Sequence, residues 1–146
     1  MEVKKVTTKE ELQDAFKIRM IVFVEEQKVP ADIEIDEHED EAVHFVLYDG
    51  AQPAGTGRFR VLDEQGKVER ICVLPQYRRS GAGLKIMNAI EDYAKGLAID
   101  TLKLNAQTSA IPFYEKLGYE TKSDVFMDAG IPHKSMIKKL ELHIKS

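Results

Sequence analysis

The junction between residues 73 and 84 constrains the fold of this chain more than any other segment. An apolar stretch, Ile71-Cys72-Val73, is followed by a basic loop with Arg78 and Arg79 and then by Gly81 and Gly83, which open a helical pattern. A strand that passes through a glycine-containing loop into a helix is a unit of a mixed α/β sheet. Such a loop gathers main-chain N–H groups at the positive end of the helix dipole. The junction therefore predicts both an α/β fold and an anion site.

The rest of the pattern predicts the elements around this junction. Thr8 and Glu11 have the spacing of a capping box, and apolar residues at three- and four-residue steps predict a helix from Thr8 through Phe23. Residues 24–40 lack periodicity and predict a loop with room for a short second helix. β-Branched and aromatic content predicts strands, which we expect at 42–48, 53–62, 67–73, 101–106, 119–121 and 133–140. Further helices are expected from Gly81 to Leu97 and around Pro112.

The order of these elements predicts a mixed α/β (α+β) sheet, antiparallel at first and with helical crossovers later. Gly55 and Gly57 in the second expected strand indicate a bulge or a close neighbour. No repeat or flexible linker divides the chain, and 146 residues fit one domain. We therefore expect a single domain over residues 1–146.

Composition excludes several classes of function. The net charge of −4 argues against broad nucleic-acid binding. Cys72 is the single cysteine, so a disulfide framework and a cysteine-based zinc cluster are excluded, and His38 lies among carboxylates without a metal-ligand spacing. The chain has no signal peptide pattern and no apolar run near the ~18 residues of a membrane helix. The expected location is the cytoplasm, with no metal and no membrane partner.

The basic loop suits a pyrophosphate, because two arginines and a helix N-terminus point positive charge at one place. No Gly-Lys-Ser/Thr ending is present, so the loop is not a Walker A motif, and no Gly-x-Gly-x-x-Gly is present, so it is not a dinucleotide fingerprint. A glycine-rich turn with solvated arginines is the alternative that the loop alone leaves open.

Two motifs together carry a resemblance to a known family. Arg78-x-x-Gly81-x-Gly83, preceded by Val73-x-Pro75-x-Tyr77, resembles the acetyl-CoA signature of the GNAT superfamily of N-acetyltransferases. Asn105-Ala106-Gln107 and the segment from Pro112 to Tyr119 resemble the family's second conserved region. Val22 to Gln27, Ile35-Asp36 and Asp128 to His133 are similar to the narrower ElaA-like and YjcF-like bacterial group. The likeness covers nearly the whole chain.

The resemblance implies a definite arrangement. In the family, a central, mostly antiparallel sheet of six or seven strands is flanked by about four helices, and a bulge opens a V-shaped split between two central parallel strands. The pantetheine arm of acetyl-CoA lies in that split, and the pyrophosphate lies on the loop. The cofactor-binding residues implied here are Ile71, Cys72, Val73, Arg78, Arg79, Ser80, Gly81, Ala82, Gly83, Leu84, Asn105, Phe113 and Tyr114.

Acetyl transfer to an amine needs an unprotonated amine, a donor for the oxyanion and an acid for the departing thiolate. The resemblance places Tyr114 at the position of the acid; packing under the helix is its alternative role. Candidates for the general base are Glu26, Glu69, His44 and His133, and ordered water can also take the proton. Cys72 lies among apolar neighbours, and we expect it to pack rather than to form a covalent intermediate.

The acceptor and the partners are the least constrained part. The sequence predicts transfer from acetyl-CoA to a primary amine of a small molecule or a peptide. The alternatives are a non-catalytic acyl-CoA-binding regulatory module and an enzyme for longer acyl-CoA. The acidic stretch Glu25–Glu41 is either a wall of the acceptor pocket or a solvated face, and Arg58, Arg60 and Arg70 are expected to pair with it. Relatives in this family often dimerise, so a homodimer is left open.

Overall fold

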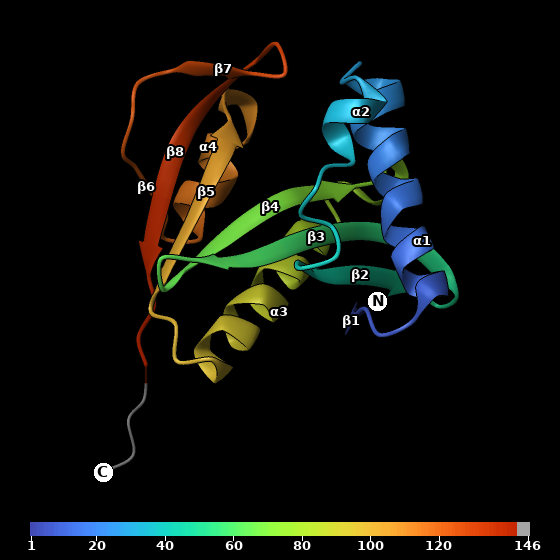
Figure 1. Ribbon diagram of the computed structural model, residues 1–146, viewed down its shortest axis with the longest axis horizontal. Helices are drawn as coiled ribbons and strands as arrows, with labels where there is room; N and C mark the ends of the chain where they lie inside the picture. Colours follow the sequence, from blue (N-terminus) through green and yellow to red (C-terminus); the bar gives the residue numbers. More distant parts are fainter. Residues whose placement is uncertain (143–146) are drawn as a thin grey trace.

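The computed structural model describes residues 1–142, whose strands form one eight-stranded twisted sheet (Figure 1). The spatial order is β1-β2-β3-β4-β5-β8-β6, with β7 paired to β8. Every neighbouring pair is antiparallel except β4 and β5, which run parallel. The strands are β1 (Glu2–Lys5), β2 (Val43–Asp49), β3 (Gln52–Leu62), β4 (Gln65–Val73), β5 (Thr101–Gln107), β6 (Glu120–Thr121), β7 (Phe126–Asp128) and β8 (Ile131–Lys139).

Four α-helices accompany this sheet in the described part of the chain: α1 (Lys9–Arg19), α2 (Ala31–Glu34), α3 (Ala82–Gly96) and α4 (Ile111–Lys116). The predicted capping box starts α1, because Thr8 Oγ1 accepts from the Glu11 amide at 3.1 Å and Glu11 Oε1 accepts from the Thr8 amide at 3.2 Å. A π-helix, Met20–Glu26, continues α1 without a break. Short 3₁₀ turns at Pro75–Tyr77 and Thr108–Ala110 precede α3 and α4.

The sequence-based expectation of a mixed, mostly antiparallel α/β sheet is confirmed, with three local corrections. The sheet has eight strands rather than six or seven, because β1 and β7 were not predicted. β7 lies inside the segment Asp124–Pro132, which was expected to be only a connection. Helical structure also continues to Glu26, where a loop from Val24 was expected, and α2 is the short helix for which that loop left room.

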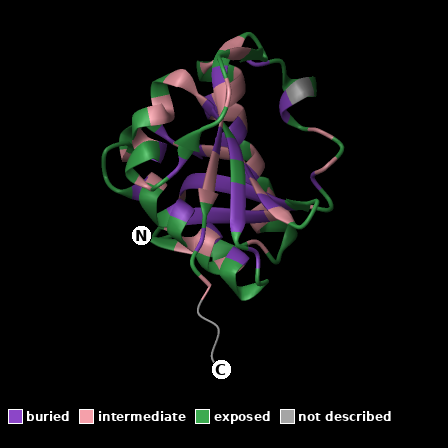
Figure 2. Cartoon of the chain, turned by 90° about the vertical axis from the view of Figure 1, so that its left-hand side faces the viewer, coloured by how far each residue is buried: buried purple, intermediate pink, exposed green. Residues whose placement is uncertain are grey.

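The two faces of the sheet are covered by different helices. On β2, Phe45 and Leu47 belong to the cluster that packs on α3, whereas Val46 between them belongs to the cluster with Ile18 of α1. Since successive strand residues point to opposite faces, α1 and α3 lie on opposite sides of the sheet. Figure 2 shows buried residues concentrated in the strands, with the outer surfaces of the helices exposed.

The glycines of β3 permit the close approach of α3. A Cβ built at Gly57 lies 2.6 Å from Ile71 Cδ1 and 3.0 Å from Ile86 Cγ2 and Ile90 Cδ1, so any side chain there collides with the helix and with β4. Ile86 and Ile90 are fully buried, and each contributes about 1.5–3 kcal/mol by leaving water. The expected close neighbour of this strand is therefore found. Across residues 1–142, the helices are all too short or too polar to cross a membrane.

Candidate functional site

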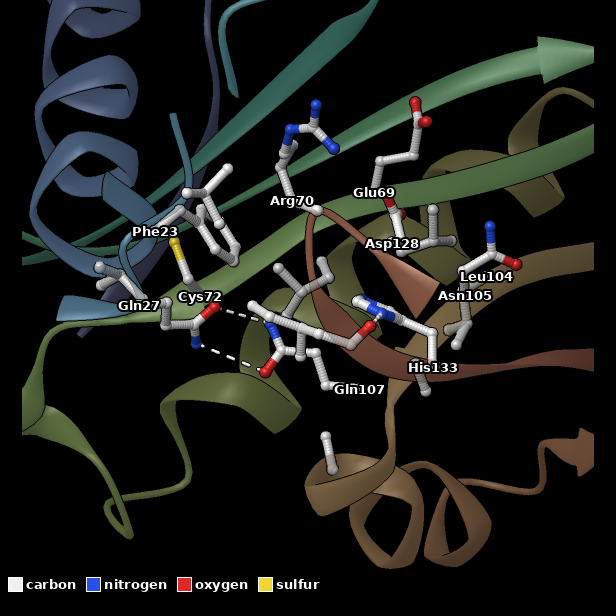
Figure 3. A pocket seen from close by; sticks show the side chains of 18 of the residues that line it. Phe23, Gln27, Glu69, Arg70, Cys72, Leu104, Asn105, Gln107, Asp128 and His133 are labelled. Atoms are coloured by element: carbon white, nitrogen blue, oxygen red, sulfur yellow. Dashed lines mark hydrogen bonds between the residues drawn. The ribbon is translucent and has the colours of Figure 1, made fainter. Parts of the chain in front are cut away.

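The site is the gap that opens between the two parallel strands. β4 and β5 pair only from Gly66 to Val68 against Leu102 to Leu104. Beyond these residues the strands diverge, and a pocket of about 360 Å³ lies between them, within the usual size range of small-molecule sites. Figure 3 shows it from close by, with Phe23 and Cys72 on one side and Asn105 and His133 on the other.

A bulge in β4 produces this divergence. The register against β3 shifts between Thr56 and Arg58, so that Gly57 lies opposite the extra residue of β4. Arg70 adopts a left-handed conformation, φ 56°, at this bulge. Past the bulge, Cys72 and Val73 still pair with β3, while their other edge faces the pocket without a strand partner. The bulge that the family resemblance implied is therefore present, in the expected strand.

The two glycines of the loop have different roles. Gly81 is the N-cap of α3 and adopts φ 83°, with open space where a Cβ would be. A Cβ at Gly83, by contrast, lies 3.1 Å from Phe113 Cζ, so this glycine allows α4 to pack against α3. In the described part of the chain no side chain caps the N-terminus of α3, so its first amides are left for another acceptor. Gly81 is thus required by backbone conformation and Gly83 by packing.

Two predicted site residues, Arg78 and Glu26, contact each other. Arg78 Nη1 and Nη2 donate to Glu26 Oε2 and Oε1 at 2.8 and 2.6 Å, and Arg78 Nε donates to the Val73 carbonyl at 3.0 Å. The hydrogen bonds from Arg78 hold the pKa of Glu26 below its ordinary value. Arg79 is exposed at φ 65°, and Ser80 Oγ donates to the Tyr77 carbonyl. A lowered pKa makes Glu26 a poor proton acceptor at neutral pH.

Tyr114 lines the pocket from α4. Its ring contacts Phe113 and Tyr119 edge to face at centroid distances of 5.0 and 5.8 Å. Burial raises the pKa of its hydroxyl, so the proton stays on the oxygen. Cys72 also borders the pocket and lies in the apolar cluster with Val22 and Leu74. Burial raises the pKa of this thiol as well, which agrees with the expectation that it packs rather than reacts.

Of the remaining candidates for the general base, Glu69 is fully engaged by arginines. Its Oε1 accepts from Arg60 Nε at 2.6 Å and from Arg58 Nη2 at 3.0 Å. Burial raises the pKa of Glu69, but hydrogen bonding to Arg60 and the charges of both arginines outweigh it, so the pKa is lowered. His44 is not among the residues that line this pocket, and its Nε2 bonds to the Glu39 carbonyl at 2.9 Å.

His133 has the more suitable environment for a proton acceptor. Its Nδ1 donates to the Ile131 carbonyl at 2.7 Å, which leaves the lone pair on Nε2. Its ring stacks on Phe126 at 6.0 Å and lines the pocket. Nε2 has no hydrogen-bond partner among residues 1–142. Asn105 also lines the pocket, where its Oδ1 accepts from Ser135 Oγ at 3.0 Å.

The acidic stretch is neither a bare wall of the pocket nor a solvated face throughout. Glu34 and Glu39 are buried and pair with Arg19, while Asp36 pairs with Arg58 at 2.8 Å. Arg58, Arg60 and Arg70 all take part in this network, as expected. The role of Arg19 was not predicted, because nothing local in α1 distinguishes an arginine that becomes buried.

A second unpredicted feature crosses the pocket. Gln27 and Gln107 exchange hydrogen bonds between their side-chain amides, with Gln107 Nε2 donating to Gln27 Oε1 at 2.7 Å (Figure 3). The reverse bond is 3.4 Å long. Gln27 follows the π-helix and Gln107 ends β5, so the pair joins the first helical region to the far side of the split. Eighty residues separate the two glutamines, and no sequence pattern links them.

Known proteins are similar to this chain in sequence and in fold. Residues 5–140 match the family model described as the acetyltransferase (GNAT) domain. An uncharacterized N-acetyltransferase of Bacillus subtilis, YjcF, is 53% identical over 130 residues, which cover 88% of this chain and 93% of that protein. The solved structure of an acyl-CoA N-acyltransferase from Pseudomonas aeruginosa is 25% identical with a TM-score of 0.83, covering 94% of this chain and 97% of that one. Escherichia coli ElaA shares the fold with a TM-score of 0.85 at 21% identity, covering 94% and 99%.

Proposed function

The chain belongs to the GNAT family of acetyltransferases, which use acetyl-CoA, and from this premise we propose that it moves an acetyl group to a primary amine by direct attack in a ternary complex. The observation that carries the proposal is the pocket at the β4–β5 split, which is bordered by both Tyr114 and Arg78. The alternative, a glycine-rich turn with solvated arginines, explains neither the bulge in β4 nor this pocket.

The donor fits the residues around the split. The edge of Ile71, Cys72 and Val73 that faces the pocket supplies main-chain groups for the amides of a pantetheine arm. The uncapped amides from Arg79 to Leu84 suit a pyrophosphate, because an N-terminal helix end carries roughly half a positive charge. Asn105 and Phe113 flank the other side of the arm in this proposal. A main-chain N–H of β4 on the pocket side is the donor for the oxyanion.

Tyr114 acts on the leaving group. Its raised pKa keeps the hydroxyl protonated, and that pKa lies above the value of about 8.5 typical of a thiol. Full proton transfer to the thiolate is therefore unfavourable, and Tyr114 instead donates a hydrogen bond that stabilises the developing negative charge. A neutral, buried hydroxyl suits this role because the negative charge on the sulfur develops only during the reaction.

His133 is the favoured proton acceptor among the residues considered. Arginines hold the pKa values of Glu26 and Glu69 low, which disfavours both of them as bases. Nε2 of His133 carries an uncommitted lone pair at the pocket wall and takes the amine proton directly or through a water. Glu26 and Glu69 then keep their arginines in place, and the acceptor enters beside the π-helix.

A thiol-release assay tests the proposal. Acetyl-CoA is offered with a panel of small cationic amines and peptide N-termini, and release of CoA is followed with a thiol reagent. We expect release that depends on one class of amine and on Tyr114. Binding of CoA without release for any amine would instead favour the non-catalytic acyl-CoA-binding module. A second measurement is calorimetry with CoA at roughly millimolar concentration, where a Kd of that size corresponds to a binding free energy of about 4 kcal/mol. Absence of heat there would refute donor binding altogether.

A further inference from the structure

The residue at the bulge of β4 is an arginine in a conformation that favours glycine. Arg70 has φ 56°, and a non-glycine residue in this region costs on the order of 1 kcal/mol or more. Glycine would form the same bulge without that cost. The side chain of Arg70 therefore contributes something that the backbone geometry alone does not require.

That side chain reaches the end of α2. Arg70 Nε and Nη2 both donate to the Glu34 carbonyl at 3.3 Å, and Nε lies 3.2 Å from Glu34 Oε2. Nη2 also donates to Asp36 Oδ2 at 3.3 Å. The guanidinium thus caps the last carbonyl of α2 and binds the two carboxylates that flank its end. Positive charge at the C-terminus of a helix is stabilising.

Glu34 is held from its other side by Arg19. Arg19 Nε donates to Glu34 Oε1 at 2.8 Å and Nη2 donates to the Glu34 carbonyl at 2.6 Å. Glu34 is 3% exposed, so it is a buried carboxylate shared by one arginine from α1 and one from β4. Asp36 is shared in the same way, since Arg58 of β3 binds both of its oxygens at 2.8 and 3.0 Å.

These contacts join two walls of one pocket. Arg70 precedes Ile71 to Val73, the edge assigned to the donor, and Glu34 ends the helix that follows the π-helix. Phe23, Val29 and Glu34 line the pocket from the helical side. Figure 3 shows Phe23 there. The guanidinium of Arg70 therefore connects the bulge that opens the split directly to the segment that covers it.

We propose that Arg70 is a positioning residue that fixes the segment Ala31–Asp36 over the split, so that an acceptor amine meets the thioester at the correct place. The inference rests on the function proposed above. Arg70 also lines the pocket, but the role proposed here passes through Glu34 and Asp36 and requires no contact with either substrate. Loss of the guanidinium should loosen the acceptor wall while the donor edge, formed by the backbone, keeps its shape.

Arg70→Gly tests this separation, because glycine retains the left-handed bulge and removes only the side chain. Ala98→Gly is the matched control: Ala98 has φ 59°, is exposed in the turn after α3, and loses only a Cβ. Arg70→Lys keeps the charge but not the planar fork. Three quantities are compared: amide hydrogen exchange of residues 31–36 in the free protein, the Kd for CoA, and kcat and KM with an amine from the thiol-release panel.

For Arg70→Gly we expect exchange at residues 31–36 to rise roughly tenfold or more, the factor for losing one hydrogen bond to a charged group. The Kd for CoA should stay within about threefold of the parent value, and kcat/KM for the amine should fall roughly tenfold or more by the same reasoning. Arg70→Lys should restore part of both effects, and Ala98→Gly should leave all three quantities unchanged.

Unchanged exchange at residues 31–36 in Arg70→Gly would overturn the proposal, as would unchanged kcat/KM with increased exchange. If Arg70→Gly fails to fold by circular dichroism, Arg70→Lys carries the test, with exchange at residues 31–36 above the parent value as the expected result. Absence of CoA binding in the parent protein would refute the proposed function alone, because the exchange arm needs no ligand.

Discussion

Glu26 and Arg78 form a two-pronged ion pair, 2.8 and 2.6 Å long, that joins the end of the π-helix to the loop before α3. Their side chains are 41% and 40% exposed, so solvent weakens the pair and it can exchange for another anion. If Arg78 contacts the phosphates of CoA, Glu26 competes with the ligand for the same guanidinium.

The first prediction follows from this competition. Glu26→Gln should tighten CoA binding by roughly two- to fivefold, the effect of one exposed ion pair, and the gain should shrink at high salt. Glu25→Gln, which removes the same charge one residue away, should change the Kd less. Isothermal titration calorimetry at two salt concentrations measures both. Weaker binding by Glu26→Gln would mean that the carboxylate supports the ligand instead of competing with it.

The second prediction concerns the leaving group. Tyr114→Phe should lower kcat roughly 100-fold by removing one donor to the developing thiolate, while the Kd for CoA changes little. Steady-state kinetics and calorimetry on the same preparation separate the two quantities. A parent-like kcat would remove Tyr114 from the chemistry and leave it a packing role.

Tyr119 supplies a contrasting substitution in the same aromatic group. Its hydroxyl is buried, and no residue from 1 to 142 forms a hydrogen bond with it. Tyr119→Phe deletes that unsatisfied group, so the free energy of unfolding should rise by about 1 kcal/mol with kcat unchanged. Chemical denaturation measures the stability. A loss of stability would show that the hydroxyl has a hydrogen-bond partner in solution.

The fourth prediction compares two exposed glycines of α3. Gly81→Ala forces a side chain into φ 83° and should destabilise the protein by about 1–2 kcal/mol. It should also weaken CoA binding, since the amides of the loop shift. Gly96→Ala meets no atom within 4 Å and should stabilise the helix by about 0.5–1 kcal/mol without affecting CoA. Equal effects of the two substitutions on CoA binding would argue against an anion site at Gly81.

Acid should weaken the buried charge network. Burial raises the pKa of Glu39, but hydrogen bonds from Arg19 outweigh it and lower the pKa to about 2, against an ordinary value of 4.5. The stabilisation is therefore complete above pH 4.5 and is lost as the pH falls toward 2; it amounts to about 3 kcal/mol. Denaturant titrations between pH 7 and pH 3 should show the decline, and Glu39→Gln should flatten it. The exposed Glu37→Gln should leave the pH dependence intact.

Local patterns predicted most of the fold. The capping box at Thr8, the glycines of β3 and the loop before α3 depend on residues close in sequence, and each is found where it was expected. β1 was missed because four residues, three of them charged, give no usable alternation. The last turn of the π-helix, from Val24 to Glu26, was missed because a widened helical turn shifts apolar residues off the ordinary spacing.

The helical side of the pocket depends on contacts that no local pattern encodes. Arg19 meets Glu39 across twenty residues and Gln27 meets Gln107 across eighty. The candidate bases were also chosen from the sequence without knowledge of the side chains beside them. The unfavourable positions of Glu26 and Glu69 became visible only once the arginines beside them were placed.

The short pairing between β4 and β5 favours activity at the expense of stability in this protein. Within residues 1–142, main-chain pairing between β4 and β5 is confined to Gly66–Val68, and beyond it both strands leave an edge that faces the pocket. A variant that lost the extra residue at Arg70 should regain a regular ladder, bury those edges and resist unfolding better. In the proposed function it would also lose the space for the donor. Screens for thermostability alone should therefore select inactive variants with substitutions or deletions between β4 and β5.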